Sequence, residues 1–364
     1  MNILVTGAYG FLGKHISLRL EELGHKVLKF GRGDIDLDFK IEKADAIFHL
    51  ASVMRSDNQN DFESANVGLT KNIVDLCQRY KKNIPIIFSS SVKADTHTIY
   101  GISKTESENR LIEYHNVYHN NLKIFRLKWL FGKWSKPFAH SVVATFIVQV
   151  HTGKELSIHD PHTIIELIYI DDVVDAMVQN LENNNQEIYI DIPNEVPISI
   201  GELASKLLYF KYCEDNGFIP SLINDFDKRL FSTYISYKED DKLDFKLNSK
   251  IDERGSFTEI LKHDSFGQIS VNVTKECIEK GNHYHSTKHE KFLVISGEAE
   301  IKLRNIYSNE IIFYNVSEIT FQLIDIPPGY VHSIKNTGNK DLVTLMWANE
   351  IFDKEKPDTF PKKV

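Results

Sequence analysis

Four residues late in the chain carry side chains that commonly bind metals. His283 and His285 are separated by one residue, Glu290 follows closely, and His332 comes much later. Alternate residues of a strand point to the same face, so the two side chains of His-x-His would lie together. Imidazole and carboxylate groups are suitable ligands for a divalent metal such as zinc. The sequence therefore predicts a divalent metal site, with zinc as the expected ion, held by these four residues.

A second group of reactive side chains lies in the first third of the chain. Tyr100 and Lys104, in YGISK, are four residues apart and would be neighbours on one face of a helix. An ammonium group beside a phenol is expected to lower the phenol pKa from about 10, which suits proton transfer near neutral pH. The run FSSS ends a predicted strand just before, where Ser90 or Ser91 could hold a substrate carbonyl. These residues predict acid/base chemistry at a carbonyl group.

Three glycines at the start of the chain indicate a dinucleotide site. In TGAYGFLG, Gly7, Gly10 and Gly13 follow an apolar run and open an amphipathic segment. Glycine there permits a tight turn and a close approach of the backbone to a pyrophosphate, while the helix N-terminus offers amides to the phosphates. About 20 residues on, Arg32 would suit a 2′-phosphate, so NADPH is the expected cofactor. The alternative is that Arg32 is a solvated loop charge and that Asp34 or Asp36 contacts the ribose.

These groups must be positioned by two different architectures. Residues 1–130 alternate strand and helix patterns, which predicts a doubly wound parallel sheet covered on both faces. A mixed pattern up to residue 245 predicts a smaller substrate lobe. After the charged stretch KEDDKLDFK, short strand-like runs separated by turn residues predict an all-β domain. The sequence thus predicts two domains, residues 1–245 and 246–364.

Composition narrows the class of partner. The formal net charge is −8 and the pI is near 6.0, so nucleic acid and anionic membranes would be repelled. Three cysteines with no close pair suggest neither a disulfide framework nor a cysteine-based zinc site. The first residues lack the pattern of a signal peptide. We expect a cytoplasmic protein that acts on a small molecule.

The motifs GAYGFLG, FSSS and YGISK follow one another in the first part of the chain. Through these motifs and their order, residues 1–245 resemble the extended short-chain dehydrogenase/reductase family that acts on nucleotide sugars. The resemblance implies a Rossmann-type fold. It implies that Tyr100 is the acid/base, that Lys104 orients the nicotinamide ribose, and that Ser91, or alternatively Ser90, positions the keto oxygen. It further implies a substrate contact at His140 and cofactor contacts at Gly7, Tyr9, Gly10, Phe11, Leu12, Gly13, Arg32, Leu50, Ala51, Tyr100 and Lys104.

The second domain resembles the cupin family, a double-stranded β-helix. The resemblance rests on G-x-H-x-H-x-x-x-x-E-x-x-x-x-x-x-G, ending at Gly297, and on P-x-G-x-x-H-x-x-x-N, which begins at Pro327. DERGSFTE and KGNHYH are also similar to cupin epimerases of deoxy-keto sugar nucleotides. That similarity implies that His283 is a base that removes a proton beside a ketone and that Lys280 contacts the substrate. In metal-binding cupins, however, His283 would be a ligand, and both roles stay open.

Together the two resemblances imply a bifunctional enzyme of capsular polysaccharide precursor synthesis, expected to be a homodimer. It would epimerise carbon 3 of a UDP-4-keto-6-deoxy-N-acetylhexosamine and then reduce carbon 4 with NADPH, giving a UDP-2-acetamido-2,6-dideoxy-L-talose type product. One alternative is a simple NADPH-dependent reductase whose cupin domain binds nucleotide or builds a dimer. A non-catalytic NADPH sensor is the alternative from another class, although it would have no need of the Tyr100 and Lys104 pair.

Overall fold

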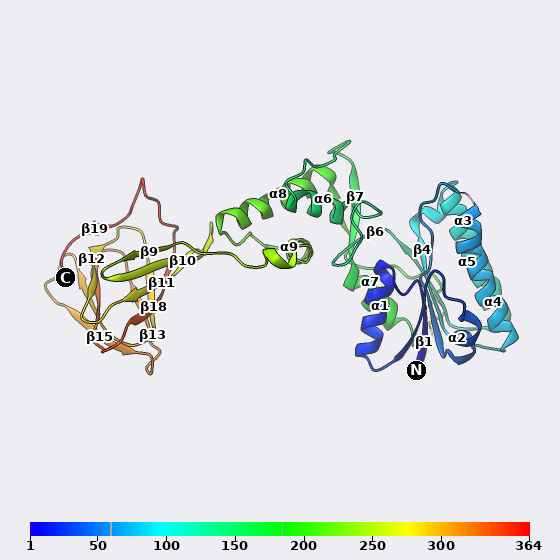
Figure 1. The fold of residues 1–364 in the computed structure, drawn as a ribbon, viewed down its shortest axis with the longest axis horizontal. Helices are drawn as coiled ribbons and strands as arrows, with labels where there is room; N and C mark the ends of the chain where they lie inside the picture. Colours follow the sequence, from blue (N-terminus) through cyan, green and yellow to red (C-terminus); the bar gives the residue numbers. More distant parts are fainter. Residues whose placement is uncertain (59, 184) are drawn as a thin grey trace. The chain divides into compact units, whose positions relative to one another are not determined.

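The computed structural model describes residues 1–58, 60–183 and 185–364, which form two compact units (Figure 1). The first unit contains residues 1–207 and 224–237, and the second contains residues 208–223 and 238–364. Helix α8 (Ile200–Asn216) contributes to both units. The units are therefore not separated by a single cut in the chain, and the domain boundary near residue 246 stays a prediction.

The first unit is built on a five-stranded sheet in which all neighbouring strands run parallel, in the order β2-β1-β3-β4-β5. Its strands are β1 (Asn2–Thr6), β2 (Lys26–Phe30), β3 (Ala46–His49), β4 (Ile86–Ser91) and β5 (Leu122–Leu127). The strand order reverses between β1 and β3. At such a point the loops after the strands diverge and leave room for a ligand.

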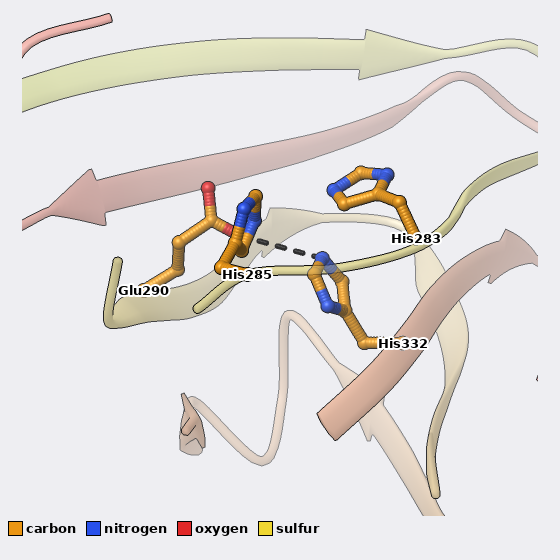
Figure 2. Close-up of side chains that lie close together, drawn as sticks. All are labelled: His283, His285, Glu290 and His332. Carbon is orange, nitrogen blue, oxygen red and sulfur yellow. Dashed lines mark hydrogen bonds and ion pairs between the residues drawn. The ribbon is translucent and has the colours of Figure 1, made fainter. Parts of the chain in front are cut away.

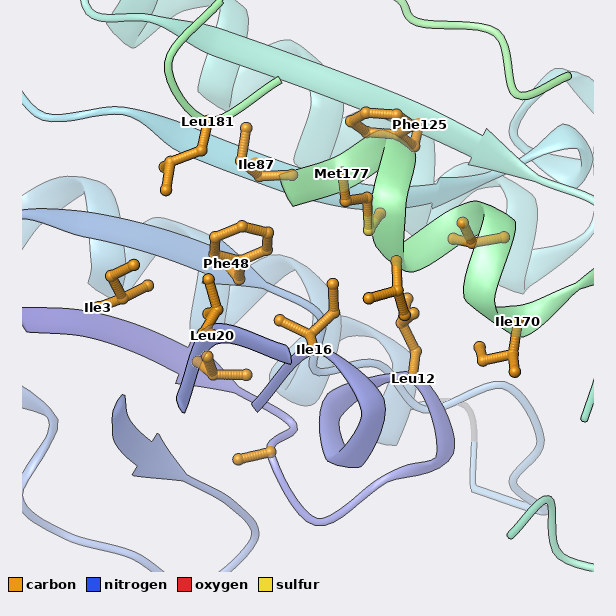
Figure 3. Close-up of a cluster of buried hydrophobic side chains, with 14 of the residues drawn as sticks. Ile3, Leu12, Ile16, Leu20, Phe48, Ile87, Phe125, Ile170, Met177 and Leu181 are labelled. Carbon is orange, nitrogen blue, oxygen red and sulfur yellow. The ribbon is translucent and has the colours of Figure 1, made fainter. Parts of the chain in front are cut away.

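Helices cover both faces of this sheet (Figure 1). On one face, α1 (Phe11–Glu22) and α7 (Ile170–Gln179) bury Ile16 and Met177 against Phe48 and Phe125 (Figure 3). On the other face lie α2 (Leu37–Lys43), α4 (Leu69–Arg79) and α5 (Ile99–Tyr118). A strand buried on both faces must be apolar throughout, as the runs ILV, AIF and IIF are.

The rest of the first unit comprises short elements and a small sheet. The short elements are α3 (Asn60–Phe62), a π-helical turn (Glu63–Gly68) and a 3₁₀ turn (Val92–Asp95). The small sheet has the order β6-β7-β8, with β6 (Trp129–Phe131), β7 (Ile164–Tyr169) and β8 (Val196–Ser199), accompanied by α6 (Val142–His151) and α9 (Asp225–Ile235). The sequence predicts a helix over IYIDDVVDAMVQNL, but α7 begins only at Ile170. Ile168 and Tyr169 instead pair with β6 and complete β7.

The second unit is formed largely by two antiparallel sheets, ordered β16-β13-β18-β11-β10-β9 and β15-β14-β17-β12-β19. One core contains residues of both sheets, for example Phe292 and Ile326 from the first with Ile301 and Ile334 from the second. The strands are β9 (Ser249–Asp252), β10 (Gly255–His263), β11 (Gly267–Thr274), β12 (Glu279–Tyr284), β13 (Glu290–Ser296), β14 (Glu298–Asn305), β15 (Ile312–Ser317), β16 (Leu323–Ile326), β17 (Tyr330–Asn336), β18 (Leu342–Ala348) and β19 (Phe360–Pro361). A 3₁₀ turn (Asp240–Lys242) precedes them.

The prediction of a parallel α/β unit followed by an all-β unit is confirmed. Among the helices of the described residues, none is both long and apolar enough to cross a bilayer.

Candidate functional site

The glycine turn after β1 is packed so closely that side chains are excluded. A Cβ on Gly7, whose φ is +68°, would lie 2.8 Å from the Ala51 nitrogen, and one on Gly13 would lie 2.1 Å from the Gly7 oxygen. The Thr6 hydroxyl accepts hydrogen bonds from the Leu50 amide at 3.1 Å and the Ala51 amide at 3.2 Å. The ends of β1 and β3 are thereby fixed beside the start of α1. The structure thus brings the predicted cofactor residues Gly7, Leu50 and Ala51 together.

The start of α1 is free to bind an anion. Gly10 is its N-cap residue, and within the described part of the chain no side chain caps it. The first amides of a helix lack partners inside the helix and attract phosphate groups. Leu12 is buried and Phe11 packs against the same core, so their amides, and not their side chains, are available to a ligand. Tyr9 is 60% exposed, and its ring covers Gly31 at the end of β2.

The loop after β2 presents one positive side chain. Arg32 is exposed, and among the described residues it forms no ion pair. The alternative ribose ligands are already engaged: the Lys40 ammonium lies 3.7 Å from the Asp34 carboxylate and 2.7 Å from that of Asp36. Asp34 also accepts a hydrogen bond from the Gly31 amide at 2.9 Å. A free guanidinium is a group that can bind a phosphate, so the 2′-phosphate contact stays a prediction.

Tyr100 lies in the first turn of α5, where Thr98 caps the helix by accepting from the Gly101 amide. Burial raises the pKa of the Tyr100 phenol, while hydrogen bonds with Ser52 and Ser91 act in the opposite direction. Ser91 ends β4, and its hydroxyl also accepts from the Lys93 amide at 3.2 Å. The phenol is therefore protonated at neutral pH and is held by two hydroxyl groups.

Lys104 follows Tyr100 by one turn of α5, as the sequence predicts, and it is buried. Its ammonium donates to the Ser89 carbonyl at 2.7 Å and lies 4.8 Å from the centre of the Phe88 ring. Burial lowers the pKa of Lys104 to about 7, against the opposing charge of Glu108. The sequence predicts that Lys104 lowers the pKa of Tyr100, but the phenol pKa is raised. The reason is that burial dominates at Tyr100 and the ammonium is held by the backbone of β4.

Ser90 points away from the phenol and into a buried polar network. Its hydroxyl donates to the Glu108 carboxylate, which is 1% exposed. Arg126 binds both oxygens of this carboxylate, at 3.0 and 2.7 Å, and the Tyr189 hydroxyl donates to it at 3.0 Å. Successive residues of a strand face opposite sides, so only one of the two serines can face Tyr100.

His140 is an exposed residue of the segment between β6 and α6. Burial of its ring and the positive charges of Arg55 and Lys136 lower its pKa. It is not among the residues that line the cavity of about 540 Å³ in the substrate lobe. That cavity includes Tyr169, Lys206 and Arg229, and Arg229 is held by Asp172 at 2.6 and 2.8 Å. A substrate contact at His140 stays a prediction.

In the second unit the structure brings the four predicted ligands together (Figure 2). One potential ligand atom from each of His283, His285, Glu290 and His332 lies within 4.8 Å of the others. The Glu290 carboxylate lies 3.2 Å from Nε2 of His285 and 3.4 Å from Nε2 of His332. The His283 ring is 4.9 Å from that of His285 and 4.4 Å from that of His332, centre to centre.

Strand pairing explains why residues so distant in sequence meet. His283 in β12 pairs directly with His332 in β17. A register shift between Gly281 and His283, with a positive φ of 60° at Asn282, re-aims the strand just before the first histidine. A Cβ on Gly281, whose φ is +102°, would lie 2.7 Å from the His332 oxygen. Glycine is therefore required for the two strands to approach.

The charges of the cluster are strongly coupled. Burial alone would raise the pKa of Glu290, but hydrogen bonds from His285 and His332 hold it well below its usual range. Burial acts to lower the pKa of His285, yet the Glu290 carboxylate outweighs it and raises this pKa. Burial, with the neighbouring histidines, lowers the pKa of His283 to about 4. A neutral imidazole next to an ionised carboxylate is the form that binds a metal.

The donor set also fits a divalent metal by its dimensions. Ligand atoms at 2.0–2.1 Å from a tetrahedral zinc ion are roughly 3.3 Å apart, close to the two Glu290 distances. Three nitrogen donors and one oxygen donor match zinc and other borderline metals. A small movement of the His283 ring toward the other three side chains would complete such a site.

The cluster lies at the wall of a cavity of about 430 Å³. Three cationic residues, Lys250, Arg254 and Lys280, line it together with His283 and Glu290. The Lys280 ammonium donates to Asn272 Oδ1 at 2.9 Å and to the Val273 carbonyl at 2.8 Å. Burial lowers the pKa of Lys280, and the negative charge of Asp252 acts in the opposite direction. The predicted substrate residue Lys280 thus shares one cavity with the histidine cluster.

Several residues at these sites are not singled out by the sequence analysis: Ser52, Glu108, Arg126, Lys250, Arg254 and Asp358. Ser52 follows the end of β3, where a search for polar side chains at strand ends would have found it. Arg254 lies within DERGSFTE, where the motif as a whole, and no single residue, indicates the similarity to cupin epimerases. Asp358 is bound to the loop after His285, and local sequence gives no indication of that contact.

Comparison with known proteins agrees with this geometry. The pattern of the NAD dependent epimerase/dehydratase family matches residues 3–191, and that of the polysaccharide biosynthesis C-terminal domain matches residues 250–360. The chain is 34% identical to UDP-2-acetamido-2,6-beta-L-arabino-hexul-4-ose reductase from Pseudomonas aeruginosa, over 99% of this chain and 98% of the relative. The crystal structure of the capsular polysaccharide assembling protein CapF from Staphylococcus aureus is 39% identical over the whole of both chains, with a TM-score of 0.93. A structure of CapF with the inhibitor 3-isopropenyl-tropolone is 36% identical over the whole of both chains, with a TM-score of 0.87.

Proposed function

The chain belongs to the NAD dependent epimerase/dehydratase family, and on this premise we propose that it is a bifunctional sugar-nucleotide enzyme of capsular polysaccharide precursor synthesis. Its substrate is a UDP-4-keto-6-deoxy-N-acetylhexosamine. The second unit inverts carbon 3, and the first unit then reduces the ketone at carbon 4. The product is a sugar nucleotide of the UDP-2-acetamido-2,6-dideoxy-L-talose type.

The name of the Pseudomonas relative supports the substrate class and the order of the steps. A hexul-4-ose carries its ketone at carbon 4, and that relative is a reductase. The proton on carbon 3 is acidic only while the neighbouring ketone is present, because the ketone delocalises the negative charge. Epimerisation therefore comes first, and reduction fixes the configuration.

For the reduction, the first unit offers a fitting cofactor site. The uncapped start of α1 and the close-packed turn at Gly7 suit a pyrophosphate, and free Arg32 suits the 2′-phosphate of NADPH. When bound, NADPH supplies the hydride for carbon 4. Tyr100 donates its proton to the oxygen on carbon 4, and its raised pKa keeps it protonated for that role. Ser91 is the serine placed to hold the same oxygen.

For the epimerisation, the second unit offers His283 as a base and several positively charged side chains. We assign the second unit to the cupin fold and residues 246–364 to its domain, supported by the two antiparallel sheets around one core. When bound at the cluster, a divalent metal such as zinc supplies charge that stabilises an enolate oxygen. Lys250, Lys280 and Arg254, which is paired with Asp252 at 2.6 Å, attract the diphosphate of the substrate to the cavity.

The observation that carries this proposal is the presence of two chemically different sites in one chain. Ser91 interacts with the Tyr100 phenol in the first unit, and four side chains that could hold a metal converge in the second. A simple reductase would not require the second set. A cofactor sensor would require neither Tyr100 nor the cluster.

Two full-length variants separate the activities. Tyr100→Phe removes a proton donor but no phosphate contact, so NADPH oxidation should fall about 10²–10⁴-fold while NADPH binding stays intact. In the same variant, uptake of deuterium from heavy water at carbon 3 should continue without NADPH. His285→Ala should show the opposite behaviour, with exchange lost and reduction of a correctly configured ketone retained.

Mass spectrometry of the recovered UDP-sugar measures exchange, and the nicotinamide absorbance measures reduction. Exchange at the wild-type rate in His285→Ala would disprove the assignment of epimerisation to the second unit. That unit would then be a binding or dimerisation module, as in the alternative function.

A further inference from the structure

Residues 358–364, which we call the clamp segment, lie along β12, which carries His283 and ends just before His285. Phe360 and Pro361 form β19, which pairs with β12 through Tyr284 and His283. The rings of Tyr284 and Phe360 stack at 5.2 Å. Beyond them, the Lys362 amide donates to the Asn282 carbonyl at 2.9 Å and the Val364 amide donates to Asn282 Oδ1 at 3.2 Å. The clamp segment thus follows β12 past both histidines.

At the other end of the clamp segment, the Asp358 carboxylate binds the turn between His285 and Glu290. It accepts from three consecutive backbone amides: Ser286 at 2.8 and 3.1 Å, Thr287 at 2.7 Å and Lys288 at 2.9 Å. The Thr287 hydroxyl donates to it at 3.0 Å. Successive amides that converge on one anion hold it strongly. Asp358 is therefore fixed relative to the loop between two of the four cluster residues.

The backbone of the same residue binds the ring of His285. Nδ1 of His285 is hydrogen-bonded to the Asp358 carbonyl oxygen. A carbonyl oxygen only accepts, so Nδ1 must carry the hydrogen and donate it. Nε2 is then the nitrogen that faces the cluster, 3.2 Å from the Glu290 carboxylate. Because a carboxylate also only accepts, Nε2 donates to Glu290 in the metal-free protein, and a bound metal would take the place of that hydrogen. One residue thereby selects both the orientation of the ring and the nitrogen that faces the cluster.

We propose that Asp358 is a positioning residue, which through its carboxylate holds the clamp segment in place and through its carbonyl presents Nε2 of His285 to a divalent metal. This inference rests on the metal site of the proposed function. The carbonyl could move with the backbone, and the hydrogen bonds that four donors make to the side chain hold it in place together with the pairing of β19. Groups that orient ligand histidines in this way commonly change metal affinity about 10- to 100-fold when removed.

The test uses the full-length protein with Asp358→Ala, which removes the acceptor of all four donors but leaves the carbonyl. Zn²⁺ affinity of the metal-free protein is measured by competition with a chromophoric chelator, and the absorption spectrum of Co²⁺ added in its place reports the ligand geometry. The His285 tautomer is measured in metal-free, ¹⁵N-histidine-labelled protein by NMR, at a pH at which the ring is neutral and carries one hydrogen, with His285→Gln to assign the resonance. Asp353→Ala is the matched control, because Asp353 is exposed and bonds only the nearby Glu355 amide among the described residues.

We expect Asp358→Ala to weaken Zn²⁺ binding about 10- to 100-fold, to change the Co²⁺ spectrum and to give a mixture of His285 tautomers. Asp353→Ala should match the wild type. Asp358→Asn, which keeps one acceptor oxygen, and Thr287→Val, which removes one of the four donors, should give smaller losses of affinity. If Asp358→Ala does not fold, the Asp358→Asn and Thr287→Val variants test the proposal in its place. Zn²⁺ affinity equal to that of the wild type in both would overturn it.

Unchanged affinity and tautomer in a folded Asp358→Ala protein also overturn it, as does an equal loss in Asp353→Ala. A wild-type protein that binds no Zn²⁺ or Co²⁺ would disprove the proposed metal site instead. In that case the tautomer comparison still decides whether Asp358 orients His285.

Discussion

The hydroxyl of Ser91 interacts with the phenol of Tyr100 and acts to lower its pKa, whereas the adjacent Ser90 donates to buried Glu108. The two serines are therefore not interchangeable. Ser91 is placed to share a substrate oxygen with the proton donor, and Ser90 completes a structural network. This difference can be tested directly.

Ser91→Ala should lower kcat/KM for ketone reduction about 10²-fold or more, because it removes a donor aimed at the developing negative charge. Ser90→Ala should leave kcat close to that of the wild type and lower the free energy of unfolding by about 1 kcal/mol, since one hydrogen bond to Glu108 is lost. Steady-state kinetics and urea unfolding measure the two effects. A larger kinetic loss in Ser90→Ala than in Ser91→Ala would contradict the assignment.

Arg32→Ala should weaken NADPH binding about 10- to 100-fold and leave NADH binding nearly unchanged. The reason is that the exposed guanidinium would form a charge-assisted hydrogen bond only with the 2′-phosphate, which NADH lacks. Fluorescence titration with both cofactors measures the difference, with Lys26→Ala in β2 as a control. Equal weakening of the two cofactors would argue against a 2′-phosphate contact.

The reduction should slow as the pH rises through the pKa of Lys104. Burial lowers that pKa to about 7, so the ammonium is mostly charged at pH 6 and mostly neutral at pH 8. Only the charged form attracts an electron-rich ribose hydroxyl. It also has three hydrogens, so it can donate to the ribose while it donates to the Ser89 carbonyl. The Tyr100 pKa is raised, so its proton remains in place over this range.

The measurement is kcat/KM for NADPH-dependent reduction between pH 6 and 8 in the wild type and in Lys104→Met. The variant should be slower and show no break near pH 7. A wild-type profile that is flat over this range, or a break that survives in the variant, would show that Lys104 does not control it.

Metal content and carbon 3 exchange, measured in the same His283→Ala sample, should distinguish a base from a ligand at this position. If His283 is the base, the variant keeps its metal and loses exchange; if it is a ligand, metal and exchange fall together. Removing metal from the wild type with a chelator should stop exchange but leave NADPH-dependent reduction of a correctly configured ketone unchanged. Loss of reduction on chelation would contradict the separation of the two activities.

The order of elements in both units could be predicted from the sequence. Apolar runs such as those of β1, β3 and β4 indicate strands buried on both faces, and the glycines after β1 indicate a turn that excludes side chains. The spacing of His283 and His285 indicates a common face, and the structure brings both to Glu290 and His332. These properties depend on residues close together in the chain, so local sequence determines them.

Other features depend on contacts between distant segments, and only the tertiary structure decided them. Which serine faces Tyr100 follows from the register of β4 against α5, and Lys104 is bound to the backbone of β4 instead of acting on the phenol. The link between Asp358 and His285 joins residues 73 positions apart. Such contacts are set by packing and strand pairing, because the partner of a buried polar group is fixed by the surrounding fold and not by its sequence neighbours.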